Sequence, residues 1–132
     1  MLKTISLRTT SRNQLVDITS QVETIVHESE VQNGICILYV PHTTAAITIN
    51  ENADPDVKHD ILNKLAELVP RLNDYAHTEG NSDAHIKSSL IGCAQTVLIS
   101  KGHLVLGTWQ GCMFAEFDGP RNRKVHVKII SD

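Results

Sequence analysis

The sequence predicts one α+β domain, spanning residues 1–132, with a largely antiparallel, barrel-like sheet and two main helices. Three observations support this fold class. The length of 132 residues suits a single domain and is enough to bury a core. Short apolar, β-branched runs recur along the chain and make up nearly all of its last third. Two segments between these runs repeat apolar residues at the helical period.

The first half of the chain contains four predicted strands and both helices. The strands are expected at 2–9, 14–19, 34–40 and 45–50, with the first two paired and the last two side by side. A capping box at Ser20–Glu23 begins the first helix, and Asn33-Gly34 ends it. The second helix starts at Asp54-Pro55, repeats apolar residues at helical spacing, and ends at Pro70.

The second half of the chain begins with a predicted loop at 71–84, whose length favours a functional role. The segment 88–92 after it becomes apolar again. Strands are then expected at 95–100, 103–109, 112–117 and 124–130, joined by turns at Lys101-Gly102 and 118–122. This order predicts a meander and a total of seven or eight strands.

Composition and charge exclude several classes of protein. Apolar residues make up 41% and charged residues 20%, which is typical of a globular protein. The net charge of −3, with both signs scattered, argues against nucleic-acid binding. No apolar run reaches the length of a membrane span, and the N-terminus lacks the apolar core of a signal peptide. We therefore expect a cytoplasmic protein with no membrane partner, and reduced, buried thiols at Cys36, Cys93 and Cys112.

Polar residues gather in Pro41–Asp60, directly after the predicted strand at 34–40. The polar and charged side chains of this segment include His42, Thr43, Thr44, Asn50, Glu51, Asn52, Asp54 and Asp56. A core strand that leads into so many polar residues is typical of one that carries them to a site. We predict that this segment forms the centre of the functional site.

Three histidines are candidate metal ligands, namely His42, His77 and His85. Neutral imidazole is the commonest zinc ligand, and a three-histidine site leaves one position open for water or substrate. The spacing from His77 to His85 is not a tight metal motif, so hydrogen-bonded surface histidines are the alternative.

One carboxylate stands out among the acidic residues that follow the strand at 45–50. Neighbouring carboxylates can divide the roles of acid and base, or bind Mg²⁺. Asp54 and Asp56 are explained by the start of the predicted helix. Glu51 has no such explanation, which makes it the candidate catalytic carboxylate.

Two features near the C-terminus each allow a functional and a structural interpretation. The glycines that flank Trp109 would let a ligand approach the strand, and a β-bulge with a core tryptophan is the alternative. Arg121 follows a Gly-Pro turn and has the planar guanidinium that binds phosphate or carboxylate, with a surface salt bridge as the alternative. The sequence alone prefers neither interpretation.

Four long segments together resemble the YjbQ family, also named the secondary thiamine-phosphate synthase enzyme family. They are HTTAAITINENADPDVKHDI, EGNSDAHIKSSLIG, GHLVLGTWQG and EFDGPRNRKVHVKII, and they cover most of the chain beyond residue 35. The resemblance implies a compact α+β subunit that forms a homotrimer with clefts between subunits. It also implies thiamine-phosphate synthesis, in which a thiazole phosphate displaces pyrophosphate from an aminopyrimidine. The implied polar site, with a metal, comprises His42, Thr44, Glu51, His77, His85 and the turn at 116–121.

These observations predict a trimeric small-molecule enzyme that acts on a phosphorylated or heterocyclic substrate. We expect Glu51 as general base, Arg121 as anion clamp, and His42 as both a catalytic residue and a ligand of zinc or magnesium, with His77 and His85. Substrate contacts are expected from the polar or aromatic side chains of Thr44, Asn81, Lys87, Trp109, Glu116 and Asp118. The alternatives are a non-catalytic trimer that binds a metabolite or metal, and motifs that mainly build the trimer.

Overall fold

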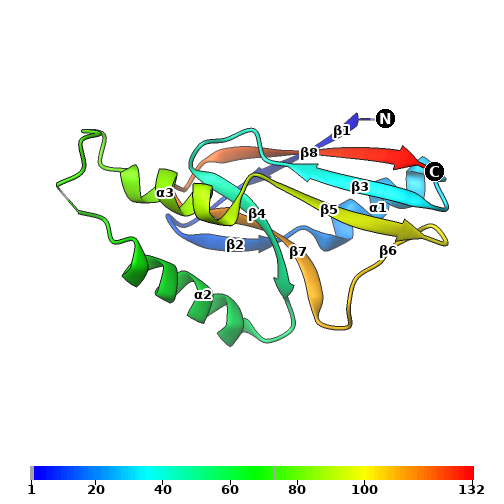
Figure 1. Cartoon of the computed structure of the whole chain (residues 1–132), viewed down its shortest axis with the longest axis horizontal. Coiled ribbons are helices and arrows are strands. Elements are labelled where there is room, and N and C mark those ends of the chain that lie inside the picture. Colours follow the sequence, from blue (N-terminus) through cyan, green and yellow to red (C-terminus); the bar gives the residue numbers. More distant parts are fainter. Residues whose placement is uncertain (1, 73) are drawn as a thin grey trace.

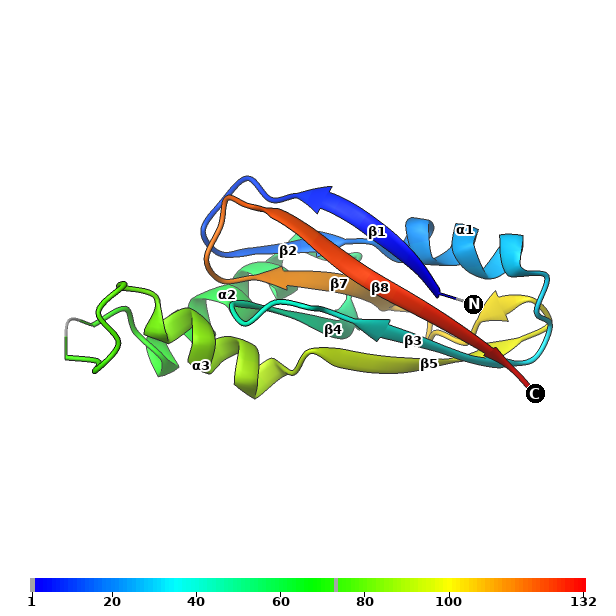
Figure 2. The same cartoon turned by 90° about the horizontal axis from the view of Figure 1, so that it is seen from above.

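The structure is a computed structural model that describes residues 2–72 and 74–132. It consists of a five-stranded antiparallel sheet, a three-stranded antiparallel sheet packed against it, and two helices on the outer face of the smaller sheet (Figures 1 and 2). A further helix closes one end of the space between the sheets. The predicted α+β class and single compact domain are confirmed, with the sheets curled into a half-barrel.

The eleven elements follow one another along the chain. The strands are β1 (Leu2–Arg8), β2 (Gln14–Asp17), β3 (Gly34–Tyr39), β4 (Ala45–Glu51), β5 (Ala94–Ser100), β6 (His103–Leu104), β7 (Gln110–Glu116) and β8 (Asn122–Ser131). The helices are α1 (Thr19–Ser29), α2 (Pro55–Leu68) and α3 (Ser82–Ile91). None of the helices in the described ranges is long and apolar enough to cross a membrane.

Strand order places distant segments side by side. The larger sheet has the order β1-β8-β3-β5-β6, and the smaller has the order β2-β7-β4. Strand β4 therefore pairs with β7 and not with β3, and β2 pairs with β7 and not with β1. Apolar alternation predicts a strand and its buried face, but it does not specify the pairing partner, which is why both predicted pairings and the C-terminal meander are wrong.

The main core lies between the two sheets. Alternate residues of β3 and β8, such as Leu38 and Val127, point inward and are fully buried against Ile47 and Phe114 of the smaller sheet. Helix α1 adds Val22 to this core. The other face of the smaller sheet packs on α2 and α3, so β7 is buried on both faces from Gly111 to Glu116.

The observed ends of α1 and α2 can be compared with the start and stop residues that the sequence predicts. Asp54 accepts a hydrogen bond from the Asp56 N–H at 2.9 Å, with Pro55 in the first turn, so the start of α2 is confirmed. Helix α1 does not use the predicted capping box, because the Asp17 carboxylate accepts from the Thr19 N–H at 2.9 Å instead. It ends at Ser29, before Asn33-Gly34, with Glu30 in the left-handed region.

Helix α3 was not predicted, and it replaces the end of the predicted loop and the apolar segment after it. The buried positions of α3 do recur at helical spacing, but two of the four are Asp83 and Lys87. An apolar periodicity search does not detect a helix whose buried face is charged. Strand β6 is also shorter than predicted. It ends at Leu104, and after the Val105 N–H bonds the Leu98 carbonyl at 2.8 Å the chain at 106–109 leaves the sheet.

Candidate functional site

Three segments meet around a cavity of about 370 Å³ at the end of the molecule near the start of α3. They are the β3–β4 connection, the N-terminal end of α3, and the turn between β7 and β8. The lining residues are Pro41, His42, Thr43, Thr44, Glu79, Asn81, His85, Asp118, Arg121 and Arg123. Of the predicted site residues, the structure therefore brings His42, Thr44, Asn81, His85, Asp118 and Arg121 together.

A buried ion pair between Glu116 and Arg123 supports this cavity. Both oxygens of Glu116 accept hydrogen bonds from the guanidinium, through Nε at 2.8 Å and through Nη2. The same carboxylate also accepts from the Thr9 hydroxyl at 2.7 Å and from the N–H groups of Phe117 and Asp118 at 3.1 and 3.0 Å. Burial raises the pKa of Glu116, but the hydrogen bonds from Arg123, Asp118 and Thr9 outweigh it and hold the pKa below its ordinary value.

The structure places Glu116 behind the cavity and not in its lining. The side chain is completely buried, and its two oxygens accept from five donors, so it joins the segments that surround the cavity. The Arg123 Nη2 also donates to the Thr44 hydroxyl at 2.9 Å, which fixes the start of the segment that leads into β4. Thr44 is 6% exposed and lines the cavity.

His42 is held in one neutral form by the backbone of β8. Its Nε2 accepts a hydrogen bond from the Lys124 N–H at 2.9 Å, which requires the ring proton to be on Nδ1. Burial lowers the pKa of His42, and the charge of Arg123 lowers it further. His42 therefore enters the site as a neutral imidazole whose Nδ1–H is a hydrogen-bond donor.

A second polar cluster forms the opposite wall. The Asp118 carboxylate accepts from Asn81 Nδ2 at 2.9 Å and from Arg121 Nη2 at 3.1 Å. The Arg121 side chain is 54% exposed, so part of its guanidinium remains available to a ligand. Asn81 Oδ1 is the buried side-chain polar atom without a hydrogen-bond partner among residues 2–72 and 74–132. A buried acceptor without a donor is costly, and it marks Asn81 as a position where a donor from a ligand or water fits.

Helix α3 is anchored by a buried charge cluster. The Asp83 carboxylate accepts from both terminal nitrogens of Arg12 at 3.1 Å and from the Lys87 Nζ at 3.2 Å. The Lys87 ammonium also lies 5.9 Å from the centre of the Phe117 ring. Lys87 is 2% exposed and does not line the cavity, so the predicted substrate contact is corrected to an anchoring role.

The three predicted metal ligands do not form one ligand set in this arrangement. The rings of His77 and His85 are close, with centroids 5.4 Å apart, and His77 Nε2 lies 3.6 Å from a Glu79 oxygen. A metal-bound histidine donates its other ring N–H to an acceptor, whereas the Nε2 of His42 faces a donor, the Lys124 N–H. Across the described ranges, no group of three or more His, Cys, Asp or Glu side chains is placed to hold a metal.

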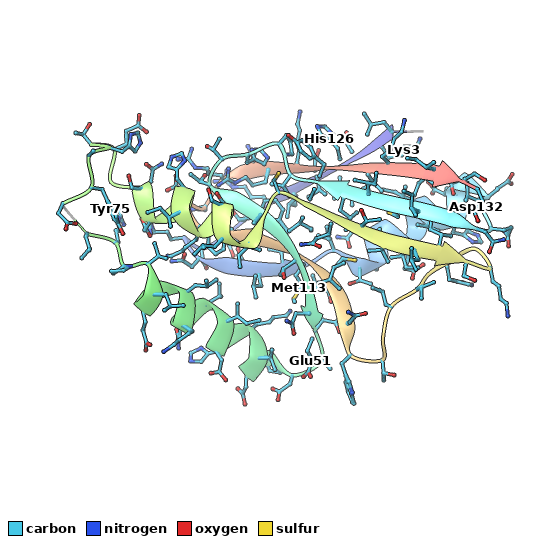
Figure 3. The ribbon with its side chains drawn as sticks, viewed as in Figure 1. Lys3, Glu51, Tyr75, Met113, His126 and Asp132 are labelled. Atoms are coloured by element: carbon cyan, nitrogen blue, oxygen red, sulfur yellow. The ribbon has the colours of Figure 1, made fainter. Side chains whose placement is uncertain are left out.

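Glu51 and Trp109 lie away from the cavity. Seven residues of extended chain, about 23 Å, separate Glu51 from Thr44. Figure 3 shows Glu51 at the far end of β4 from the α2–α3 connection, where Tyr75 is labelled. Glu51 accepts from the Asp54 N–H at 3.2 Å, so it has the structural explanation that its sequence context did not reveal. Trp109 is 62% exposed in the β6–β7 connection, neither in a core nor at this site.

The cysteines divide into two kinds. Cys36 and Cys112 are fully buried, and burial raises the pKa of the first to about 12 and of the second to about 11, so both are inert thiols as expected. Cys93 is exposed, which corrects its predicted burial. It lines a neighbouring hollow that also contains His42 and His85.

Sequence reasoning missed Arg123 as a site residue, although a signal was present. Arg123 has the same parity as Val125, Val127 and Ile129, which are the inward-facing residues of β8. The alternation therefore places an arginine on the buried face of a strand, where it requires a buried carboxylate partner.

The protonation state and tautomer of His42 can be measured directly. Long-range ¹H–¹⁵N NMR spectra should show the neutral Nδ1–H form, with an imidazole pKa below 6.5, because Nε2 accepts from a backbone amide. Spectra of His42→Gln would assign the resonances by their disappearance. A neutral ring with its proton on Nε2 would contradict the assigned role.

Comparisons with known proteins identify the relatives of this chain. A family model described as "UPF0047 protein YjbQ-like" matches residues 3–132. A UPF0047 protein of Methanocaldococcus jannaschii is 59% identical over 132 residues, covering 100% of this chain and 96% of the relative. The UPF0047 protein YugU of Bacillus subtilis is 50% identical over 131 residues, covering 98% and 99%.

Solved structures agree with the sequence comparisons. An uncharacterised YjbQ/UPF0047 protein of Clostridium acetobutylicum has a TM-score of 0.95 at 56% identity, covering 97% of this chain and 99% of its own. A YbjQ-like protein of unknown function from Sulfolobus solfataricus has a TM-score of 0.96 at 37% identity, covering 100% and 97%. These similarities establish the fold and the family of this chain, but they do not identify an activity. The chain belongs to the YjbQ-like UPF0047 family.

Proposed function

We propose that the protein is a small-molecule enzyme that binds an anionic metabolite in the cavity beside His42. The observation that carries this proposal is the fixed, neutral state of His42 in a cavity that also contains Arg121 and the unpartnered Oδ1 of Asn81. A neutral Nδ1–H donor and a partly exposed guanidinium suit an oxygen that gains negative charge during a reaction. Asn81 supplies an acceptor that orients a donor group of the same ligand.

The resemblance to the thiamine-phosphate synthase family suggests one reaction of this type. In it, the ring nitrogen of a thiazole phosphate forms a bond to the methylene carbon of an aminopyrimidine, and the bond from that carbon to pyrophosphate breaks. The leaving pyrophosphate takes the electron pair and needs donors and cations near its oxygens. We propose His42 and Arg121 for this role, in place of the general base predicted at Glu51.

The rival proposal is a non-catalytic module that binds its ligand without converting it. A substitution at His42 separates the two, because an enzyme loses turnover while a binder retains most of its affinity. We expect His42→Gln to lower thiamine-phosphate formation by about a hundredfold, the loss typical of one oxyanion donor. Product formation from the two phosphorylated substrates is the measurement.

The matched control for that assay is His59→Gln, which changes an exposed histidine on α2 whose ring hydrogen-bonds Asn63 one turn away. The control should retain wild-type turnover. Equal turnover in all three proteins would contradict catalysis at this cavity, and ligand binding without turnover in any of them would favour the binding module.

A divalent metal, zinc or magnesium, remains a proposal that rests on fewer residues than the sequence suggested. The closeness of His77 and His85 favours these two as ligands, and the backbone contact of His42 disfavours the third. We expect that any zinc bound after purification without a chelating tag is lost in His77→Ala and retained in His42→Ala. Metal analysis by mass spectrometry provides the readout, and loss of zinc from His42→Ala alone would contradict this assignment.

We also propose that the subunit forms a homotrimer through the open face of the larger sheet. Ile35 lies directly opposite both Leu98 and Ile130, and the Val105 N–H bonds the Leu98 carbonyl, so four apolar residues form one row across the sheet. Leu98, Val105 and Ile130 are 59%, 50% and 44% exposed. Burial of such a row between subunits would be favourable.

Solution mass tests the trimer. Leu98→Lys should shift the mass measured by light scattering from trimer to monomer, because it places a charge in the buried row. Leu68→Lys changes a leucine that is 66% exposed at the end of α2 and should remain trimeric. A monomeric wild-type protein would contradict the proposal.

A cytoplasmic location also remains part of the proposed function.

A further inference from the structure

The larger sheet has an unusual distribution of charge. The protein carries a net charge of −3 and fifteen acidic residues, yet none of the five strands of this sheet contains Asp or Glu. The same strands contain the basic residues Lys3, Arg8, Arg123, Lys124 and Lys128. An acidic protein with a wholly basic sheet presents a local positive potential that the net charge conceals.

Three of these five basic residues, Arg8, Arg123 and Lys124, line a hollow of about 320 Å³ that opens on β1 and β8 beside His42. Its lining residues are Ser6, Leu7, Arg8, His42, Asn122, Arg123 and Lys124. No carboxylate is among them. The candidate cavity on the other side of His42 differs, because Glu79 and Asp118 contribute to its lining.

Strand register explains how the donors converge. Ser6 lies opposite Lys124, and Arg8 lies opposite Asn122, so the four side chains share the open face of the sheet. Arg8 and Lys124 are exposed, and neither forms an ion pair within residues 2–72 and 74–132. The Arg8 guanidinium donates one long hydrogen bond, 3.4 Å, to the Asn122 Oδ1. Two cations, a hydroxyl and an amide thus face one hollow without an anion.

We infer that this hollow binds a phosphate group, and that it receives the anionic end of the ligand whose reacting part lies in the cavity across His42. The inference rests on the proposed function. An arginine and a lysine without carboxylate partners suit a doubly charged anion, and the Ser6 hydroxyl and Asn122 amide add neutral donors. His42 and Arg123 line both hollows, so a ligand that spans them passes His42. The substrate class is a phosphate monoester.

Titration with inorganic phosphate, followed by amide shifts in ¹H–¹⁵N NMR spectra, tests the inference. We expect the shifts to concentrate at residues 6–8 and 122–124. The double variant Arg8→Gln/Lys124→Gln should weaken phosphate binding about tenfold or more, because it removes both charge-assisted contacts. Acetate should bind more weakly than phosphate, since it carries one charge. Acetate binding as tight as phosphate binding would overturn the phosphate class.

Lys128→Gln is the matched control, because Lys128 belongs to the same strand and the same open face but lies outside the hollow. It should change phosphate affinity by less than about twofold, the effect of weak screened attraction. Equal weakening in both variants would show general attraction to a basic face and overturn the inference, as would the absence of any phosphate-dependent shift.

A third outcome separates this inference from the proposed function. Phosphate shifts that centre on residues 118–121 and survive the double variant would place the anion in the candidate cavity. The further site would then be wrong, while the enzymatic proposal would stand, because it is judged by turnover in His42→Gln.

Discussion

The buried contact between Glu116 and Arg123 is the interaction on which the rest of the site depends. It joins the end of β7 to the start of β8, and through Thr9 and Thr44 it also ties in the β1–β2 and β3–β4 connections. Three regions far apart in sequence, around Thr9, around Thr44 and at the β7–β8 turn, are thus fixed to one carboxylate and one guanidinium. A buried ion pair contributes little net stability compared with apolar residues of the same shape, but the loss of one partner leaves an uncompensated charge and costs about 3–5 kcal/mol. The pair therefore specifies one arrangement of the chain around the cavity.

The charge chemistry of the site follows from this arrangement. Arg123 helps to keep His42 neutral, and the Lys124 N–H next in sequence fixes its proton on Nδ1. The lowered pKa of Glu116 means that its ionised form favours the folded state, so its contribution is present above the ordinary pKa of 4.5 and is lost as the pH falls through the lower folded value. The Asp83 cluster under α3 follows the same rule, with an ordinary value of 3.8. Lowering the pH should thus weaken both the Glu116–Arg123 pair and the Asp83 cluster.

Local patterns predicted local structure well and long-range convergence poorly. Alternation in β8 and the Asp54-Pro55 start of α2 have causes within a few residues, and both were predictable. Helix α3 was not, because its buried face contains Asp83 and Lys87, whose partner Arg12 lies 71 residues away from Asp83. The polar segment after β3 did mark the site, but β4 runs in extended form and takes Glu51 out of reach of His42. Spacing along the chain cannot distinguish a carboxylate that meets a histidine from one at the other end of a strand.

The most direct test of the central role of this pair is urea unfolding of Glu116→Gln at pH 7. The substitution leaves the buried Arg123 without a counter-charge, so the free energy of unfolding should fall by about 3 kcal/mol or more. Glu67→Gln, which removes an exposed partner of Lys64, should change it by less than about 1 kcal/mol. The difference between wild type and Glu116→Gln should shrink as the pH is lowered below 4.5, the ordinary pKa of the glutamate. Equal stability of Glu116→Gln and wild type at pH 7 would contradict the role assigned to the pair.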